Sequence, residues 1–285
     1  MTRLARPSQT EQRSWARQVS DVVDSVEAES AAYNQVTPPR VALYKVAVVL
    51  LTAAIGLTLV AFLRSGGNPG WILTLLRGVG LDGVAASLAD ALLGDGNTEF
   101  NRLVVFVVVT VFGLIVVPVL SITLILREPV RDYGLRFRGT LGSSRPYAAL
   151  FAVTFPFLVL ASFNGEFLAR YPMYEMFPGE SWWPYLWAWW ALYAIQFIAI
   201  EFFFRGFMIN GLKLRMGFSA VFVMVVPYTM IHFHKPMPEA LAAIIGGIVL
   251  GYLSLKTRSI WWGVALHIAI AGSMDVLALT QAGPL

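Results

Sequence analysis

Long apolar stretches alternate with short polar segments along most of the chain. They occupy residues 42–63, 103–126, 147–163, 183 to around 204, 218–231, 240–255 and 260–279. A helix crosses the hydrocarbon layer of a bilayer, roughly 30 Å thick, in about 20 residues. The pattern therefore predicts an all-α membrane protein, a polytopic bundle of about seven transmembrane helices in which the fifth and sixth are short.

Two further segments have helical patterns of another kind. Residues 71–93 are apolar but interrupted by charges and three glycines, which predicts an amphipathic or re-entrant helix pair. In the polar N-terminal tail, apolar positions between 15 and 26 recur at helical spacing, which predicts an amphipathic helix on the membrane surface. A mobile tail is the alternative. Pro38 and Pro39 would end that helix.

Composition supports the membrane assignment. The 285 residues are 57% hydrophobic and only 13% charged, whereas soluble domains carry about 25% charged residues. A water-soluble globule would have to expose the long apolar runs, so that class is excluded. There is no cysteine, which excludes disulfides, thiolate metal sites and a cysteine nucleophile.

Basic residues are distributed unevenly between alternate loops of the chain. Alternate loops, beginning with the N-terminal tail, hold sixteen of the 21 Lys and Arg residues with seven acids, and the remaining loops hold five with eight acids. Cytoplasmic loops are enriched in bases, so we expect a multi-pass protein of the cell membrane with its N-terminus in the cytoplasm and its C-terminus outside. The net charge of +4 is a topology signal. The bilayer is the expected partner, with no nucleic acid.

These segments divide the chain into three parts. Residues 1–40 are a polar cytoplasmic tail, and residues 41–135 hold two transmembrane helices joined by an external amphipathic loop. Residues 136–285 form the domain in which chemistry is expected.

Three local patterns have structural interpretations. Gly78, Gly80 and Gly83 match G-x-G-x-x-G by chance, because no strand precedes them. Gly247 and Gly251 form G-x-x-x-G and predict close packing of the sixth helix on a neighbour. An aromatic cluster over 182–190 is typical of an interfacial belt.

Ionisable groups inside a membrane are costly, so each one is a functional candidate. The set includes all three histidines of the chain. Within the runs or directly after them lie Glu201, Arg205, His232 and His267, and near span ends lie His234, Glu239 and Asp275.

Glu201 and Arg205 stand four residues apart, the spacing of an ion pair on one helix face. Mutual neutralisation is one interpretation of the pair. A second interpretation is that Glu201 belongs to a site with His232, because the two residues are expected at the same depth in the membrane. Glu201 lies sixteen residues before the turn near Gly217, and His232 lies fifteen after it. At 1.5 Å per residue both lie roughly 23 Å from that turn. His267 reaches the same layer if the two cytoplasmic turns differ in depth by several ångströms.

Two kinds of chemistry suit such a cluster. Glu201, His232 and His267 can bind one divalent metal, zinc being the first choice, with a position open for water. Without a metal, the carboxylate can activate water while the histidines stabilise an oxyanion. The structural alternative for each histidine is a hydrogen bond to a helix carbonyl.

The remaining candidates are expected to support the site or to be structural. Glu239 follows Pro238 at a helix start, where an acid complements the helix dipole. His234 is expected to be solvated. Asp275 lies about 12 Å along the helix from His267, too far to share a metal easily, and is expected to bind polar groups near the outer mouth.

At these residues the sequence resembles the CPBP family, also called Abi, of intramembrane CAAX proteases and bacteriocin-processing enzymes. Glu201-Phe-Phe-Phe-Arg205 resembles its E-E-x-x-x-R motif, and Tyr228-Thr-Met-Ile-His232 resembles F-x-x-x-H with Tyr in the Phe position. The segment ending at His267 resembles the approach to H-x-x-x-N/D. The likeness covers roughly residues 147–279.

The resemblance departs at two positions. Ile200 replaces the first Glu of the paired acids, which in the family is the one usually assigned to water activation, and Ala271 replaces the final Asn or Asp. What the resemblance implies is a hydrolase, a metallo- or glutamate-type intramembrane peptidase, with Glu201 activating water and Arg205 keeping it ionised. Glu239 or Asp275 would supply the missing oxygen ligand.

The function expected from this resemblance is endopeptidase cleavage near the C-terminus of a membrane-anchored or lipid-modified protein. The alternative is a non-hydrolytic relative that acts as a membrane scaffold or an immunity or binding protein. A proton-coupled transporter is the third class, disfavoured because no repeated half is visible.

Overall fold

A computed structural model describes residues 15–64, 70–93, 98–137, 140–175 and 183–281. Within these ranges it contains helices and no β-strand, which confirms the all-α prediction. Residues 1–14 of the predicted tail, and Trp182 of the predicted aromatic belt, lie outside the described residues.

The helices follow one another with short connections. The first half contains α1 Trp15–Val36, α2 Pro39–Arg64, α3 Gly70–Gly78, α4 Asp82–Leu93, α5 Thr98–Val111, the π-helical η1 Phe112–Val116, α6 Val117–Leu120 and η2 Ser121–Leu126. The second half contains α7 Ser144–Ala161, α8 Gly165–Leu168, α9 Tyr185–Glu201, the π-helical η5 Phe202–Ile209, α10 Asn210–Met216, α11 Ser219–Met230, α12 Met237–Thr257 and α13 Trp261–Gln281. Short 3₁₀ turns lie at Val130–Asp132 (η3) and Leu141–Ser143 (η4).

Six helical segments of the described chain are long and apolar enough to span a membrane, and α11 is a shorter apolar helix. The fifth predicted apolar segment, which was expected to be short, is α11. Its 12 residues rise about 18 Å, less than the hydrocarbon layer, because the helix starts after the turn at Gly217 and ends at Met230. The protein is a multi-pass membrane protein.

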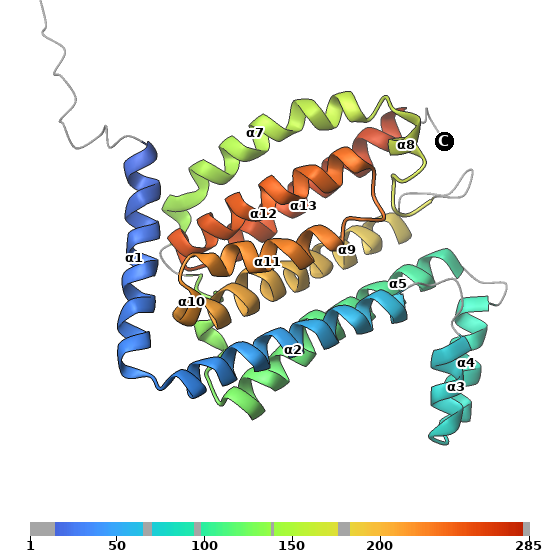
Figure 1. Ribbon diagram of the computed structural model, residues 1–285. Coiled ribbons are helices and arrows are strands. Elements are labelled where there is room, and N and C mark those ends of the chain that lie inside the picture. Colours follow the sequence, from blue (N-terminus) through green and yellow to red (C-terminus); the bar gives the residue numbers. More distant parts are fainter. Residues whose placement is uncertain (1–14, 65–69, 94–97, 138–139, 176–182, 282–285) are drawn as a thin grey trace, which may run out of the picture.

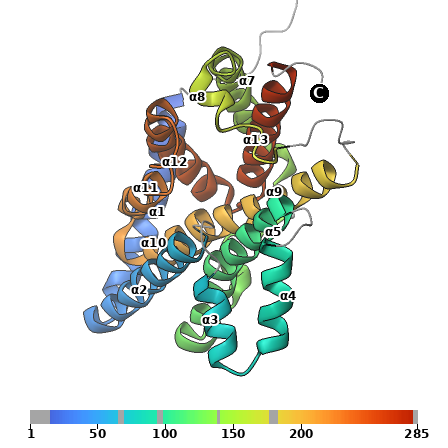
Figure 2. The same cartoon turned by 90° about the vertical axis from the view of Figure 1, so that its right-hand side faces the viewer.

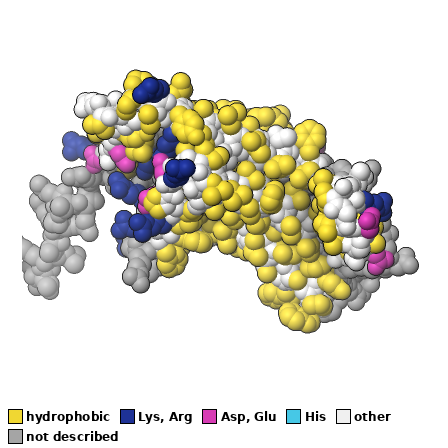
Figure 3. Space-filling view, turned by 90° about the horizontal axis from the view of Figure 1, so that it is seen from below, with side chains coloured by type: hydrophobic (Ala, Val, Ile, Leu, Met, Phe, Trp, Pro, Cys, Tyr) yellow, Lys and Arg dark blue, Asp and Glu magenta, His cyan; other side chains and the backbone are white. Residues whose placement is uncertain are grey.

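The long helices run side by side as a bundle, with α7, α12, α13, α11 and α9 above α2 and α5 in the view of Figure 1. Helix α1 crosses one end of this bundle, and the α3–α4 hairpin projects from the other, as Figure 2 also shows. The predicted helix pair over 71–93 is thus confirmed as two helices. Lys and Arg gather at the α1 end of the surface in Figure 3, beside a broad hydrophobic middle.

The predicted N-terminal helix is confirmed as α1, but its apolar residues Val22 and Val26 pack on protein, where the prediction had its apolar face on the membrane surface. Val26 is buried and Val22 is packed against the same core. Helix α1 contacts α10 and α12, and Tyr252 of α12 donates a hydrogen bond to the carbonyl of Gln18 (3.3 Å). The helix therefore closes one end of the bundle.

The core centres on the π-helical segment η5, whose eight residues are all buried. Gly206 of this segment allows a close approach, because a Cβ there would lie 2.7 Å from the carbonyl oxygen of Tyr133. The loop that contains Tyr133 also accepts hydrogen bonds from the start of α13, from Ile260 N to Gly134 (3.0 Å) and from Trp261 Nε1 to Leu135 (3.2 Å). It ties η5 to α13.

The predicted close packing at the G-x-x-x-G pattern is confirmed. A Cβ on Gly247 would lie 3.0 Å from Cδ1 of Tyr228, and one on Gly251 would lie 2.7 Å from Cγ1 of Val221. The two glycines therefore let α12 press against α11. This packing fixes the ring of Tyr228 from one side.

Candidate active site

Glu201 stands at the end of α9, where the helix changes from α to π geometry. Its side chain is 1% exposed, and that of Arg205, one turn on, is 0% exposed. Single-turn π segments inside α-helices are often found at functional sites. The change of geometry therefore coincides with the charged pair that the sequence singled out.

The Glu201 carboxylate is enclosed by three neighbours. Oε1 lies 3.0 Å from Nη1 of Arg205 and 2.9 Å from Nδ1 of His267. Oε2 faces Gly263, where a Cβ would overlap it. The predicted convergence of Glu201 and His267 is thus present, from helices α9 and α13.

Several polar atoms of this cluster lack an aligned hydrogen-bond partner. They are Oε1 of Glu201, Nδ1 of His267 and the three guanidinium nitrogens of Arg205. The contacts at Oε1 are close in distance but poorly directed. Catalytic hydrogen bonds are often loose in this way before substrate binds, whereas buried polar groups in a purely structural network are normally satisfied.

His267 is the most accessible member of the cluster, with 14% of its side chain exposed. Its ring stacks on Phe197 of α9, with ring centroids 5.4 Å apart and planes 7° from parallel. Its second nitrogen, Nε2, lies 3.1 Å from the hydroxyl of Tyr228. Both ring nitrogens therefore face a polar group, and the ring orientation is fixed.

Tyr228 joins the cluster from α11 and contacts Arg205 and His267. The guanidinium carbon of Arg205 lies 4.1 Å from the centre of its ring, the geometry of a cation–π interaction. Phe204 packs edge-on against the same ring. In the motif resemblance Tyr228 was noted only as a Tyr in the Phe position, and that difference was the one sequence signal for its place in the cluster.

His232 lies against Tyr228. Its Nδ1 is 2.8 Å from the carbonyl oxygen of Tyr228, and the two rings are 4.9 Å apart. Burial lowers the pKa of His232 to about 4, and nearby Lys235 adds to this effect. A neutral ring that donates Nδ1–H to a carbonyl presents Nε2 as an acceptor.

The arrangement does not fit the divalent metal expected from the sequence. Within the described ranges, no group of three or more His, Asp or Glu side chains is placed to hold a metal ion. Of the three expected ligands, Glu201 and His267 are in contact with each other, while His232 is held by the Tyr228 carbonyl. A structural zinc site needs four ligands and a catalytic one three.

Asp275 forms a separate buried site two turns further along α13. Its oxygens accept hydrogen bonds from the backbone N–H of Met173 (3.2 Å) and from the indoles of Trp189 (3.3 Å) and Trp190 (3.2 Å). The expected role as a partner for polar groups is present. Trp189 and Trp190 are therefore not only interfacial belt residues, as predicted, but hydrogen-bond donors in the interior.

The outer group of candidates lies at the start of α12. Glu239 pairs with Lys235 and accepts hydrogen bonds from the hydroxyl of Tyr171 (3.3 Å to each oxygen). Burial and this carboxylate raise the pKa of Tyr171. His234 is exposed, as expected. Glu239 thus has neighbours of its own and supplies no ligand to the Glu201 cluster.

Ile200 and Ala271 are both buried in apolar clusters. Ala271 packs one turn after His267 among Tyr193, Trp189 and other apolar side chains. Neither position is vacant space that a missing carboxylate or amide has left. At both positions an apolar side chain packs in the hydrophobic core.

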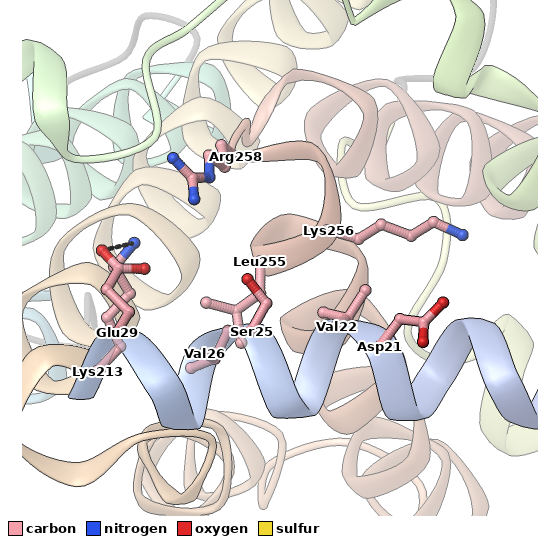
Figure 4. A pocket seen from close by; sticks show the side chains of 9 residues that line it. All are labelled: Asp21, Val22, Ser25, Val26, Glu29, Lys213, Leu255, Lys256 and Arg258. Carbon is pink, nitrogen blue, oxygen red and sulfur yellow. Dashed lines mark ion pairs between the residues drawn. The ribbon is translucent and has the colours of Figure 1, made fainter. Parts of the chain in front are cut away.

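A cavity of about 240 Å³ lies elsewhere, between α1, α10 and the end of α12. Figure 4 shows three cationic side chains around it, Lys213, Lys256 and Arg258, with the carboxylates of Asp21 and Glu29. Lys213 lies 4.0 Å from Glu29. This cavity contains none of the site candidates.

Comparison with known proteins bears on the segment that carries the cluster. Residues 180–272 match the family model described as Rce1-like, Type II CAAX prenyl endopeptidase Rce1-like. No curated protein and no solved structure matches the chain. The matched segment includes Glu201, Arg205, His232 and His267, so this part of the chain is similar to CAAX-protease-like membrane proteins, in agreement with the resemblance found in the motifs.

Proposed function

We propose that this protein is an intramembrane endopeptidase that hydrolyses a peptide bond near the C-terminus of a membrane-anchored or lipid-modified protein. The observation that carries the proposal is the contact between Glu201, Arg205 and His267 inside the segment that matches the Rce1-like model. The loop charges favour a cytoplasmic N-terminus. Because the cluster lies on helices that are apolar enough to span a membrane, its substrates would be proteins embedded in or anchored to the same membrane.

We assign the roles within the cluster with the burial of each side chain as support. Glu201 is enclosed by Arg205, His267 and Gly263, so it orients His267 and compensates its charge in place of holding water itself. Arg205 keeps the carboxylate ionised. This is the division of labour of an acid–imidazole pair in which the carboxylate fixes the ring and stabilises the imidazolium.

Hydrolysis then needs one proton acceptor and one water. The water oxygen attacks the carbonyl carbon while its proton passes to His267, which becomes an imidazolium beside Glu201. The tetrahedral intermediate collapses, the C–N bond breaks, and the imidazolium returns the proton to the leaving amine. The acceptor nitrogen of His232 holds the water for attack.

The test is cleavage by the full chain in liposomes. A synthetic lipid-modified C-terminal tail is incubated in ¹⁸O-labelled water, and mass spectrometry follows the shortened product. We expect one ¹⁸O in its new carboxylate, and a loss of at least about 100-fold in rate for His267→Gln and about 10-fold for His232→Ala. His234→Ala serves as the matched control and should cleave like wild type. Undiminished cleavage by His267→Gln would end the assignment.

A second function is favoured by the apolar side chains at Ile200 and Ala271. A relative that has lost hydrolysis would bind a membrane partner without cleaving it. The discriminating variant is Ile200→Glu combined with Ala271→Asn, which restores both family residues. If wild type does not cleave and this variant does, the non-hydrolytic function holds. Cleavage by wild type refutes it.

A further inference from the structure

Tyr228 is the feature of the site that the family motif does not explain. The motif has Phe at this position, and the chain differs by one hydroxyl group. That hydroxyl is placed 3.1 Å from Nε2 of His267. The ring that carries it is 3% exposed and is packed against Gly247, Phe204 and Arg205.

The tautomer of His267 follows from its two polar neighbours, Glu201 at Nδ1 and Tyr228 at Nε2. An ionised carboxylate only accepts, so the nitrogen of His267 that faces Glu201, Nδ1, carries the proton. In the neutral ring Nε2 then accepts, and the Tyr228 hydroxyl donates to it. The three side chains form a chain from carboxylate to imidazole to phenol, with helices α9, α13 and α11 contributing one member each.

Nε2 has a single lone pair in the ring plane, and the hydroxyl of Tyr228 occupies it. A proton that reaches His267 must therefore pass through that hydroxyl. We propose that Tyr228 is a catalytic proton-relay residue that connects the attacking water to the His267–Glu201 pair. This inference rests on the proposed function and names a residue that the motif leaves as an apolar Phe.

The relay balances in atoms and charge. The water gives a proton to Oη of Tyr228 while the hydroxyl proton of Tyr228 moves to Nε2 of His267. The water oxygen bonds to the substrate carbon, and Tyr228 is left as a neutral phenol. Imidazolium forms on His267, compensated by Glu201, and the reverse transfer protonates the leaving amine.

Arg205 makes the phenol suited to this role. Its guanidinium lies over the Tyr228 ring, 4.1 Å from the centroid, and its three nitrogens lack an aligned hydrogen-bond partner. A cation at this place stabilises negative charge that develops on the phenol oxygen during transfer. Arg205 therefore interacts with two members of the relay. It forms an ion pair with Glu201 and a cation–π contact with the ring of Tyr228.

The backbone of Tyr228 serves the second histidine. Its carbonyl oxygen accepts from Nδ1 of His232 (2.8 Å), so Nε2 is the acceptor nitrogen of a neutral His232 ring. The same residue thus sets the protonation of both rings. The His232 ring also lies against the Tyr228 ring, with the two ring centroids 4.9 Å apart.

The variant that tests the relay is Tyr228→Phe, which removes only the hydroxyl and restores the motif residue. The matched control is Tyr133→Phe, a buried tyrosine whose hydroxyl donates to Glu128 (2.6 Å) outside the cluster. In the liposome assay we expect kcat of Tyr228→Phe to fall about 100-fold with KM within about 2-fold. Tyr133→Phe should keep the wild-type kcat. Wild-type kcat in Tyr228→Phe overturns the relay.

A second measurement separates the relay from the proposed function. The chain has three histidines, so ¹⁵N-histidine labelling and NMR in detergent micelles resolve each ring, with His234→Ala and His232→Ala assigning the signals. We expect His267 to show an unprotonated, hydrogen-bonded Nε2 in wild type and a shifted Nε2 signal in Tyr228→Phe. Identical His267 signals overturn the relay even if no tail is cleaved. A shifted signal without cleavage supports the hydrogen-bonded chain and contradicts the peptidase function alone.

Discussion

Two buried carboxylates lie on the interface of α9 and α13 and differ in how they are satisfied. Asp275 accepts three hydrogen bonds from neutral N–H groups that cannot change their charge. Glu201 faces a guanidinium and an imidazole at close distance without aligned hydrogen bonds. Both are almost fully buried.

The partners of the two carboxylates indicate a structural role for Asp275 and support the proposed chemical role of Glu201. A carboxylate held by three fixed donors is a hydrogen-bonded anchor, and it ties the loop before α9 and two indoles to α13. A carboxylate next to a titratable ring can stabilise a proton that moves. The same helix pair therefore carries a hydrogen-bonded anchor at one end and the proposed reactive pair at the other.

The largest expected effect comes from Arg205→Met. It leaves the Glu201 carboxylate buried without its cation, and breaking a buried pair costs about 3–5 kcal/mol. The free energy of unfolding in detergent should fall by this amount. The control is Lys235→Met, which breaks an ion pair of the same i, i+4 spacing that is about one quarter exposed and should cost less than about 1 kcal/mol. Equal losses in the two variants would refute a buried charge at Glu201.

The next effect is that of Gly263→Ala. Its methyl group would overlap Oε2 of Glu201 and shift the carboxylate relative to His267. Displacement of about 1 Å in a reacting pair can cost about 100-fold in rate, so cleavage should fall between about 10- and 100-fold. Gly272→Ala, on the same helix with no atom within 4 Å of its added Cβ, should leave cleavage unchanged.

Asp275→Asn tests the anchor. The amide nitrogen cannot accept from the indoles, so at least one N–H loses its partner, and the free energy of unfolding should fall by about 1–3 kcal/mol. The cleavage rate per folded molecule should stay at the wild-type value. A rate loss as large as that of Gly263→Ala would mean that Asp275 belongs to the reaction.

The smallest effect is expected for Trp190→Phe. It removes one of the three donors to Asp275 and should cost about 1 kcal/mol of the free energy of unfolding. Trp187→Phe is its control, because Trp187 is exposed and packs edge-on against Trp190. A loss in Trp190→Phe no larger than in the control would remove this indole from the anchor.

The sequence predicted the parts of this fold that depend on long-range averages. Six apolar runs became spans because hydropathy over about 20 residues reports directly on bilayer crossing. The meeting of Glu201 and His267 was predicted from depth, on the condition that the two cytoplasmic turns differ in depth, and the two side chains are in contact. Both inferences needed only helical rise and position along the chain.

The contacts of individual side chains could not be predicted from hydropathy averages or helical rise. The π-helical segment between Glu201 and the turn at Gly217 changes the rise per residue, so counting at 1.5 Å per residue does not give the depth of Glu201 relative to His232. Trp189 and Trp190 were assigned to an interfacial belt because they were counted as hydrophobic residues, which leaves out the N–H group that each indole donates to Asp275. The hydroxyl of Tyr228 was visible only as a departure from a motif, and its partner lies 39 residues away.

The central claim is that Glu201, and not Asp275, is the carboxylate of the reaction. The direct measurement is the initial rate of tail cleavage in liposomes by wild type, Glu201→Gln and Asp275→Asn, each divided by the amount of folded protein. We predict a loss of at least about 100-fold for Glu201→Gln and the wild-type rate for Asp275→Asn. A Glu201→Gln protein that cleaves at the wild-type rate would contradict the account.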